Sequence, residues 1–252
     1  MTADQYLLNI LVGQHVNNGP TSPVRSVQNV LLPALSTWGN GYLIAVHPSG
    51  SFAKGTANRS GTDIDLFLSV SENVPGTMKE IYDSLFNQMT QRGYTPKRQN
   101  VSVNVQVNGY SVDLVPGRRQ NGYSNDHTLY RRKADTWTKT NVITHINQVA
   151  NSGCTNEIRI LKLWRNQKGL DFPSFYLELT AIAALSGRYG SLSQRVWTVF
   201  EYLRDRFPAA RVIDPANTNN VISDDLTVQD RARISVAAKA ALGASSWNQI
   251  VT

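Results

Sequence analysis

The chain contains very little cysteine and no long apolar run. Cys154 is the single cysteine among 252 residues, so a disulfide within the chain is excluded. This usage is typical of a reducing compartment, and we expect a cytoplasmic protein. No stretch of 18 apolar residues occurs, and the N-terminus lacks the basic start and apolar core of a signal peptide. We therefore expect neither a membrane-spanning helix nor a membrane partner.

Several catalytic signatures are also missing. The four histidines are scattered without the spacing of a metal-ligating set, which argues against a zinc site. The stretch from Gly50 to Thr56 matches half of a P-loop, but no lysine follows its second glycine, Gly55. No nucleophile-elbow motif surrounds Ser51. These absences exclude a P-loop NTPase and give no support to a zinc enzyme or a serine hydrolase.

The charge balance is basic, with a formal net charge of +7 and a pI of about 9.6. Such a balance is common in proteins that handle polyanions, because counterion release and long-range attraction favour binding. Basic and aromatic residues gather between positions 118 and 137, where they can grip a nucleotide or RNA or form a solvated linker. We expect NTP substrates, and a nucleic-acid or protein activator is compatible with this charge.

The first half of the chain mixes helical and strand patterns. Apolar spacing predicts helices over 4–17 and 75–92, and Ser22-Pro23 is a typical start for a third helix that ends near Gly39. Asn108-Gly109 is typical of a tight turn between two strands. The predicted strands are 42–47, 63–70, 101–107 and 110–115.

The pattern changes after Pro116. Residues 117–139 are polar, basic and aromatic without a clear period, and we expect a long loop there. Residues 212–225 are rich in Asn and Asp and are expected to be irregular. We predict an α+β protein, with a mixed-sheet lobe over residues 1–140 and a helical lobe over residues 141–252. The helices predicted in the second lobe are 142–151, 155–168, 173–187, 191–206 and 228–242.

Two carboxylates stand two positions apart in an apolar strand. Asp63 and Asp65 are expected to share one face of that strand, and Asp113 lies in a later apolar strand. Like charges this close repel one another unless a cation lies between them, and oxygen ligands suit Mg²⁺. Three carboxylates can hold two ions, one on the attacking oxygen and one on the leaving group. The sequence therefore predicts a site for two Mg²⁺ ions, which Mn²⁺ can replace.

A glycine-serine turn precedes these carboxylates. Gly50 allows a close approach of the backbone, and the Ser51 hydroxyl with neighbouring amides can bind triphosphate oxygens. Taken singly, each motif has an ordinary explanation: an Asp-x-Asp pair arises by chance, Asp113 can be a capping residue, and Gly50 can be a plain loop glycine. Their combination is what a two-metal phosphoryl-transfer site needs.

These motifs resemble the polymerase-β-like nucleotidyltransferase superfamily. The segments 50–67 and 112–119 are most similar to oligoadenylate synthetases, to the bacterial CD-NTases related to cyclic GMP-AMP synthase, and to archaeal-type CCA-adding enzymes. The resemblance implies that Asp63, Asp65 and Asp113 are the catalytic and metal-binding residues. It also implies that the Gly-Ser turn binds nucleotide.

The resemblance extends into the helical lobe. The segments 157–165 and 172–179 are similar to the helical domain of oligoadenylate synthetases, where a lysine and a serine hold the donor triphosphate. The matching residues are Lys162 and Ser174, and Tyr176 is a candidate to stack on the donor base. The helical pattern turns Lys162 away from the core stripe, where it can reach phosphate or remain solvated.

The predicted activity is nucleotidyl transfer from an NTP, with release of pyrophosphate. The chain carries little beyond the two predicted lobes, which favours a small acceptor and a synthase of cyclic or linear oligonucleotide second messengers. The resemblance further implies a role in bacterial antiviral defence. The alternatives are an RNA 3′-terminal nucleotidyltransferase of the CCA-adding or poly(A) type, and a nucleotide- or RNA-binding module that has lost activity.

Overall fold

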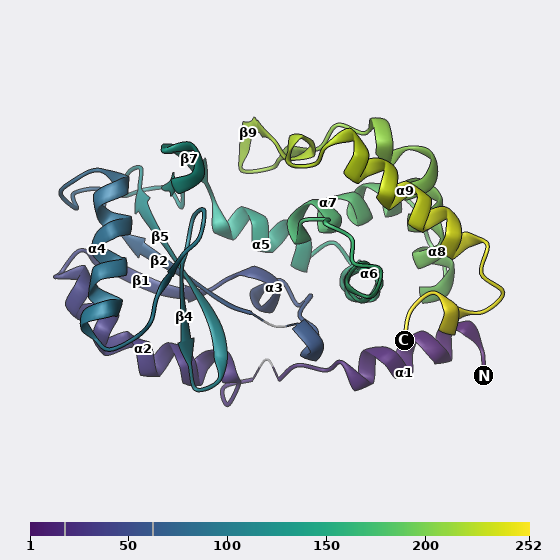
Figure 1. The fold of residues 1–252 in the computed structure, drawn as a ribbon, viewed down its shortest axis with the longest axis horizontal. Helices are drawn as coiled ribbons and strands as arrows, with labels where there is room; N and C mark the ends of the chain where they lie inside the picture. Colours follow the sequence, from purple (N-terminus) through teal and green to yellow (C-terminus); the bar gives the residue numbers. More distant parts are fainter. Residues whose placement is uncertain (18, 62) are drawn as a thin grey trace. The chain divides into compact units, whose positions relative to one another are not determined.

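The computed structural model describes residues 1–17, 19–61 and 63–252 and divides them into two compact units. The sheet unit comprises residues 17–54 and 61–146. The helical unit comprises residues 1–16, 55–60 and 147–252. Figure 1 shows helices together with a mixed sheet, which confirms the predicted α+β class.

Within the described residues, the sheet unit contains a seven-stranded mixed sheet with the order β1-β2-β5-β4-β3, to which β6 and β7 are added beside β5. The pair β2–β5 is parallel, and every other pair is antiparallel. The strands are β1 Leu43–Pro48, β2 Ile64–Val70, β3 Lys97–Arg98, β4 Val103–Val107, β5 Tyr110–Arg119, β6 His127–Arg131 and β7 Thr136–Thr140. The helices are α2 Pro23–Gly39, α3 Gly50–Ala53 and α4 Met78–Gln91.

Local signals set the ends of these elements. Ser22 caps α2 by accepting a hydrogen bond from the Arg25 amide, and α2 closes at Asn40 in a left-handed conformation. A capping box begins α4, in which Thr77 and Glu80 satisfy each other's backbone amides. Asn108 and Gly109 have φ values of 51° and 81°, as a tight hairpin turn requires.

Two stretches differ from the sequence-based expectation. The predicted loop 117–139 contains the end of β5 and the antiparallel pair β6–β7. The predicted irregular stretch 212–225 contains a small antiparallel hairpin, β8 Ile213–Asp214 and β9 Asn217–Val221. In both places the strands are polar and short, so their sequences carry little apolar alternation, and pairing alone defines them.

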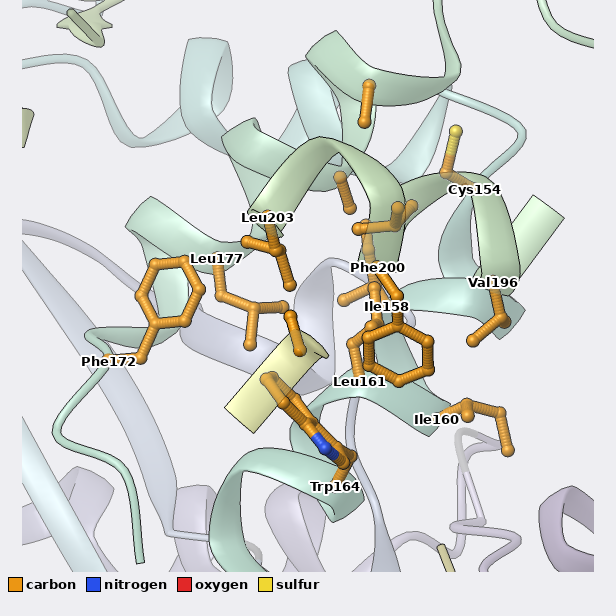
Figure 2. Packing of buried hydrophobic residues seen from close by; sticks show 14 of the residues in the cluster. Cys154, Ile158, Ile160, Leu161, Trp164, Phe172, Leu177, Val196, Phe200 and Leu203 are labelled. Atoms are coloured by element: carbon orange, nitrogen blue, oxygen red, sulfur yellow. The ribbon is translucent and has the colours of Figure 1, made fainter. Parts of the chain in front are cut away.

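The helical unit packs around Trp164. Its ring lies edge-on to Phe200 at 5.0 Å between ring centroids, and Figure 2 shows the aliphatic residues around them. Aromatic rings at this spacing and tilt stabilise a core beyond their buried area. The helices are α1 Ala3–Gly13, α5 Val142–Ala150 at the boundary of the units, α6 Thr155–Gln167, α7 Ser174–Leu185, α8 Leu192–Asp205 and α9 Val228–Leu242.

The expected boundary at residue 140 differs from the observed division at the N-terminal end. The sequence pattern places residues 4–17 in the mixed-sheet lobe, but helix α1 belongs to the helical unit. Leu7 and Leu11 of α1 are buried in the core around Trp164. This apolar stripe needs a partner surface, and the helical unit provides it. Residues 55–60 also belong to the helical unit.

In the part of the chain that the structure describes, no helix combines the length and apolar character needed to cross a bilayer.

His127 is a buried polar residue of the sheet. Its Nδ1 lies 2.8 Å from the Asn125 carbonyl oxygen, so that nitrogen donates, and its Nε2 lies 2.8 Å from the Ser69 hydroxyl. Burial is the main cause that lowers the pKa of His127. The folded protein therefore prefers the neutral ring, whereas the unfolded chain protonates its histidine below about pH 6.5.

We expect the stability of the sheet unit to fall as the pH drops through 6.5 toward the lowered pKa of His127. In that range the unfolded state binds more protons than the folded state, so the free energy of unfolding decreases with falling pH. Thermal unfolding followed between pH 7.5 and 5 tests this. The His127→Gln variant should show a smaller pH dependence than wild type, and an equal dependence would contradict the assignment.

Candidate active site

The parallel pairing of β2 and β5 places two predicted carboxylates side by side. Asp65 of β2 is the direct partner of Asp113 of β5, and Asp113 is in turn the partner of Asn104 in β4. Partners in register project to the same face of a sheet. The preceding partners, Ile64 and Val112, are buried on the opposite face. A polar row thus crosses three adjacent strands.

Asp113 is half-buried and hydrogen-bonded within this row. Its Oδ1 accepts a hydrogen bond of 2.7 Å from the Asn104 amide. Burial raises the pKa of Asp113, and the charge of Asp63 raises it further, while hydrogen bonds from Asn104 and Ser102 act in the opposite direction. The ionised carboxylate is therefore costly here unless a cation accompanies it.

Asp63 lies just before the strand and not within it. The sequence pattern placed the start of the strand at residue 63, but β2 begins at Ile64 and Asp63 is exposed. Its carboxylate nevertheless acts on Asp113, since its charge raises the pKa of that group. Thr62, which precedes it, lies outside the described residues.

The glycine-serine turn is packed directly against Asp65. Gly50 has a φ of +58°, and a Cβ atom on it would lie 1.7 Å from the Asp65 Oδ2. The Ser49 amide also donates a hydrogen bond of 2.8 Å to the Asp65 carbonyl oxygen. Both the backbone conformation and the space therefore require glycine at position 50. Ser51 follows in the single turn of α3 and is half-buried.

The chemistry of this donor set suits a divalent cation that prefers oxygen. Asp65 and Asp113 are neighbours in register, and Asp63 is close enough to act on the pKa of Asp113. Among residues 1–17, 19–61 and 63–252, no three His, Cys, Asp or Glu side chains already stand in a metal-binding arrangement. The suitability of the site for a divalent cation thus rests on the type of the residues, on the strand register and on the repulsion between the carboxylates. It does not rest on a complete set of ligands already in place.

Lys162 is not where the helical pattern placed it. The pattern turned it away from the core, but it is buried in α6 of the helical unit. Its ammonium group lies 2.6 Å from Glu178 Oε1 and 2.9 Å from Thr56 Oγ1. Glu178 neutralises the charge, which is what allows a lysine to be buried. The phosphate-binding role of Lys162 stays a prediction.

Ser174 and Tyr176 also lie in the helical unit, at the start of α7. Ser174 is exposed, and its hydroxyl accepts a hydrogen bond of 2.9 Å from Arg165. Tyr176 is fully buried between Phe172 and Phe207, with ring centroids 5.2 and 5.3 Å away. A ring enclosed in this way has no free face for a base, so the stacking role expected for Tyr176 is wrong in this structure.

Three residues that contact predicted site residues have little or no signal in the sequence. Asn104 stands in an apolar strand, and the Asn108-Gly109 turn fixes the register that puts it opposite Asp113. Because the Asn108-Gly109 turn defines that register, the position of Asn104 opposite Asp113 can be predicted from the sequence. Thr56 and Glu178 carried no signal, because their partner Lys162 is remote in the sequence.

We expect Asp113→Asn to stabilise the protein in the absence of divalent ions. The pKa of Asp113 is higher in the folded protein than in the unfolded chain. Its contribution to the free energy of unfolding is therefore fully present below the unfolded-state pKa and is lost as the pH rises through the folded-state pKa. Asparagine mimics the protonated acid at every pH. At pH 7 in a chelator, the melting temperature should rise by about 2 °C or more.

The matched control is Asp126→Asn. A hydrogen bond from Lys139 lowers the pKa of Asp126, so this substitution should lower the melting temperature instead. A lower melting temperature for Asp113→Asn in the chelator would contradict the burial argument. Addition of Mn²⁺ or Mg²⁺ with ATP should then stabilise wild type more than Asp113→Asn.

No model of a known protein family matches the chain. A cyclic AMP-AMP-AMP synthase of Escherichia coli strain MS 115-1 is 25% identical in an alignment 239 residues long, and the alignment covers 78% of this chain and 74% of that protein.

Solved structures share the fold along nearly the whole chain. E. coli MS115-1 CdnC with ATP matches with a TM-score of 0.76 at 22% identity, over 96% of this chain and 91% of that one. The Bradyrhizobium diazoefficiens CD-NTase CdnG in complex with GTP matches with a TM-score of 0.73 at 14% identity, over 98% and 94%. CdnC has also been solved in a complex with HORMA-deltaN.

A nucleotidyltransferase of another kind has a similar fold. The Cid1 poly(U) polymerase bound to MgATP matches with a TM-score of 0.71 at 12% identity, over 95% of this chain and 93% of that one. The sequence match, in contrast, is to a cyclic oligonucleotide synthase. Together with the aspartate pair in register beside the glycine turn, these likenesses confirm the resemblance of the chain to the nucleotidyltransferase superfamily and to its CD-NTase branch.

Proposed function

We propose that this protein joins NTPs into a cyclic or linear oligonucleotide second messenger and releases pyrophosphate. One observation carries the proposal: Asp65 and Asp113 are direct partners on parallel strands, and Gly50 packs against Asp65 with no room for a side chain. Neighbouring carboxylates beside a turn whose glycine leaves the backbone uncovered suit nucleotidyl transfer.

The three aspartates would hold the divalent cations, of which Mg²⁺ is the first choice and Mn²⁺ a substitute. When bound, two such ions neutralise the charge of the triphosphate and lower the pKa of the acceptor hydroxyl. Asp113 is the candidate general base, because burial and Asp63 raise its pKa toward the range in which a carboxylate accepts a proton. As it takes the hydroxyl proton, the hydroxyl oxygen bonds to the α-phosphorus and the bond to pyrophosphate breaks.

The turn at Gly50 and Ser51 would hold the triphosphate of the incoming nucleotide. Gly50 leaves its backbone uncovered by a side chain, and the Ser51 hydroxyl can donate to a phosphate oxygen. Lys162 and Ser174 keep the donor-phosphate role that the family resemblance implies. Their present partners are Glu178 and Arg165.

ATP is the first substrate to test, because the sequence relative is a cyclic AMP-AMP-AMP synthase and CdnC was solved with ATP. CdnC was solved in a complex with HORMA-deltaN, and on this likeness we propose that a protein partner activates this chain. We place the reaction in the cytoplasm, where NTPs are available.

The deciding experiment incubates the protein with labelled ATP, or with mixed NTPs, and Mg²⁺, with and without RNA. Phosphatase-resistant small products without RNA, identified by mass spectrometry, would support the messenger synthase and would give the bases and linkage. Label found on RNA alone would support the 3′-terminal transferase, the alternative that the Cid1 likeness supports only weakly. No product with any NTP, metal, RNA or protein activator would contradict both enzymes and leave a binding module.

A further inference from the structure

Residues 55–60 form a short segment that belongs to the helical unit although its sequence neighbours belong to the sheet unit. Along the chain it joins the turn at Gly50 and Ser51 to Asp63. In its described residues the segment has no strand or α-helix, and a 3₁₀ turn begins only at Arg59. Its polar groups therefore depend on partners elsewhere in the helical unit.

The first anchor of the segment is Thr56, which is completely buried. Its hydroxyl donates a hydrogen bond of 2.9 Å to Glu178 Oε1 and accepts one of 2.9 Å from the Lys162 ammonium. Lys162 and Glu178 are themselves 2.6 Å apart. Thr56 thus closes a buried triangle in which every pair is bonded.

The charges in this triangle compensate each other. Lys162 and Glu178 retain only 7% and 1% of their side-chain exposure, so each charge is compensated mainly by the protein and not by water. A buried ion pair is weak evidence for stability, but it tolerates few arrangements, because a displaced partner leaves a bare charge. The triangle therefore fixes where Thr56 lies more than it adds to the stability of the fold.

The second anchor is Asn58, which exchanges two hydrogen bonds with Arg159. The Asn58 amide donates to the Arg159 carbonyl oxygen at 2.9 Å, and the Arg159 Nε donates to Asn58 Oδ1 at 3.1 Å. Arg159 also donates to the carbonyl oxygens of Leu11 and Gln14, at 3.1 and 2.9 Å. The side chain of one arginine thus joins the segment to the end of α1.

The third anchor is Gln14, at the end of α1. Its side-chain oxygen accepts a hydrogen bond of 3.0 Å from the Ser60 amide, and its carbonyl oxygen accepts one of 3.2 Å from the Arg59 amide. The segment is therefore held along its whole length, by α1, α6 and α7. Such complete anchoring exceeds what a short surface connection needs.

We propose that Thr56 and Glu178, joined through Lys162, are positioning residues for nucleotidyl transfer. They fix the segment 55–60, and through the chain they restrict Gly50 and Ser51 on one side and Asp63 on the other. The role rests on the proposed function, because positioning has a meaning only for a reaction at these residues. Small displacements of reacting groups are enough to slow an enzyme strongly.

The test uses Thr56→Val, which keeps the shape of the side chain and removes the hydroxyl. We expect the turnover number to fall by about 10- to 100-fold, with the KM for ATP changed by less than about twofold. Thr56→Ser restores the hydroxyl and should recover most of the rate. Glu178→Gln should lower turnover as Thr56→Val does.

The matched control is Thr180→Val, in α7. Thr180 is equally buried, and its hydroxyl has no hydrogen-bond partner among the described residues, so its removal should leave turnover and KM unchanged. An unchanged turnover number for Thr56→Val, or an equal loss for Thr180→Val, would overturn the proposal. A rise in KM without a fall in turnover would also overturn it, because that result indicates lost nucleotide contact.

A second measurement does not depend on activity. Arg59 is exposed and lies within the anchored segment, so trypsin cleavage after Arg59, timed by mass spectrometry, reports release of the segment. We expect faster cleavage in Thr56→Val than in wild type and Thr180→Val at equal melting temperatures. An unchanged cleavage rate would overturn the proposal. If wild type made no product but Thr56→Val were cleaved faster, the proposed function would fail and the anchoring would stand.

Discussion

Asp65→Asn should reduce the rate of nucleotidyl transfer by about a thousandfold, because it removes about 4 kcal/mol of charge stabilisation and so raises the activation free energy by that amount. Asparagine keeps the size of the side chain and its contact with Gly50, so the fold should be retained. Initial rates of pyrophosphate release from ATP and Mg²⁺ measure the effect. Circular dichroism and the melting temperature check the fold.

The control for this loss is Asp83→Asn, on the surface of the sheet unit. Asp83 pairs with Arg98 at 2.7 Å, and both side chains are partly exposed, so the pair contributes little. Its removal should change the rate by less than about twofold. If Asp65→Asn kept a tenth or more of the wild-type rate, Asp65 would have no role in binding a catalytic cation.

Many helix and strand positions in the sheet unit can be predicted from local sequence signals. The Ser22-Pro23 start, the Asn108-Gly109 turn and the apolar run of β2 each act within a few residues, so a sequence contains all that is needed to interpret them. The parallel pairing of β2 with β5 is different. It joins segments separated by α4 and two strands, and only the register reveals that Asp65 faces Asp113.

The predictions that the structure contradicts share one cause: each depends on a contact with a residue that is distant in the sequence. Lys162 reads as a surface lysine until Glu178 is known to lie against it, and Tyr176 reads as available until Phe207 covers it. Helix α1 carries an apolar stripe that fits any complementary surface, and the helical unit binds it through Leu7 and Leu11. A hydrophobic pattern predicts that a face of a helix is buried, but it does not identify the element that covers that face.

Gly50→Ala should lower turnover by about 100-fold or more, because it acts directly on Asp65. Alanine at a φ of +58° is strained, and its methyl group would fall 1.7 Å from the Asp65 Oδ2. The carboxylate must move away, or the turn must open. In either case Asp65 and the turn lose the arrangement that the proposed reaction requires, and kcat for ATP measures the loss.

Gly93→Ala separates backbone strain from the clash. Gly93 has a φ of +83°, and a Cβ atom there would meet nothing within 4 Å, so this variant carries the strain alone and should keep its rate. The double variant of Gly50→Ala with Asp65→Asn then identifies the route of the effect. If the alanine acts by displacing the Asp65 carboxylate, the double variant should be no slower than Asp65→Asn, whereas a further loss equal to that of Gly50→Ala would mean that the turn acts independently of Asp65.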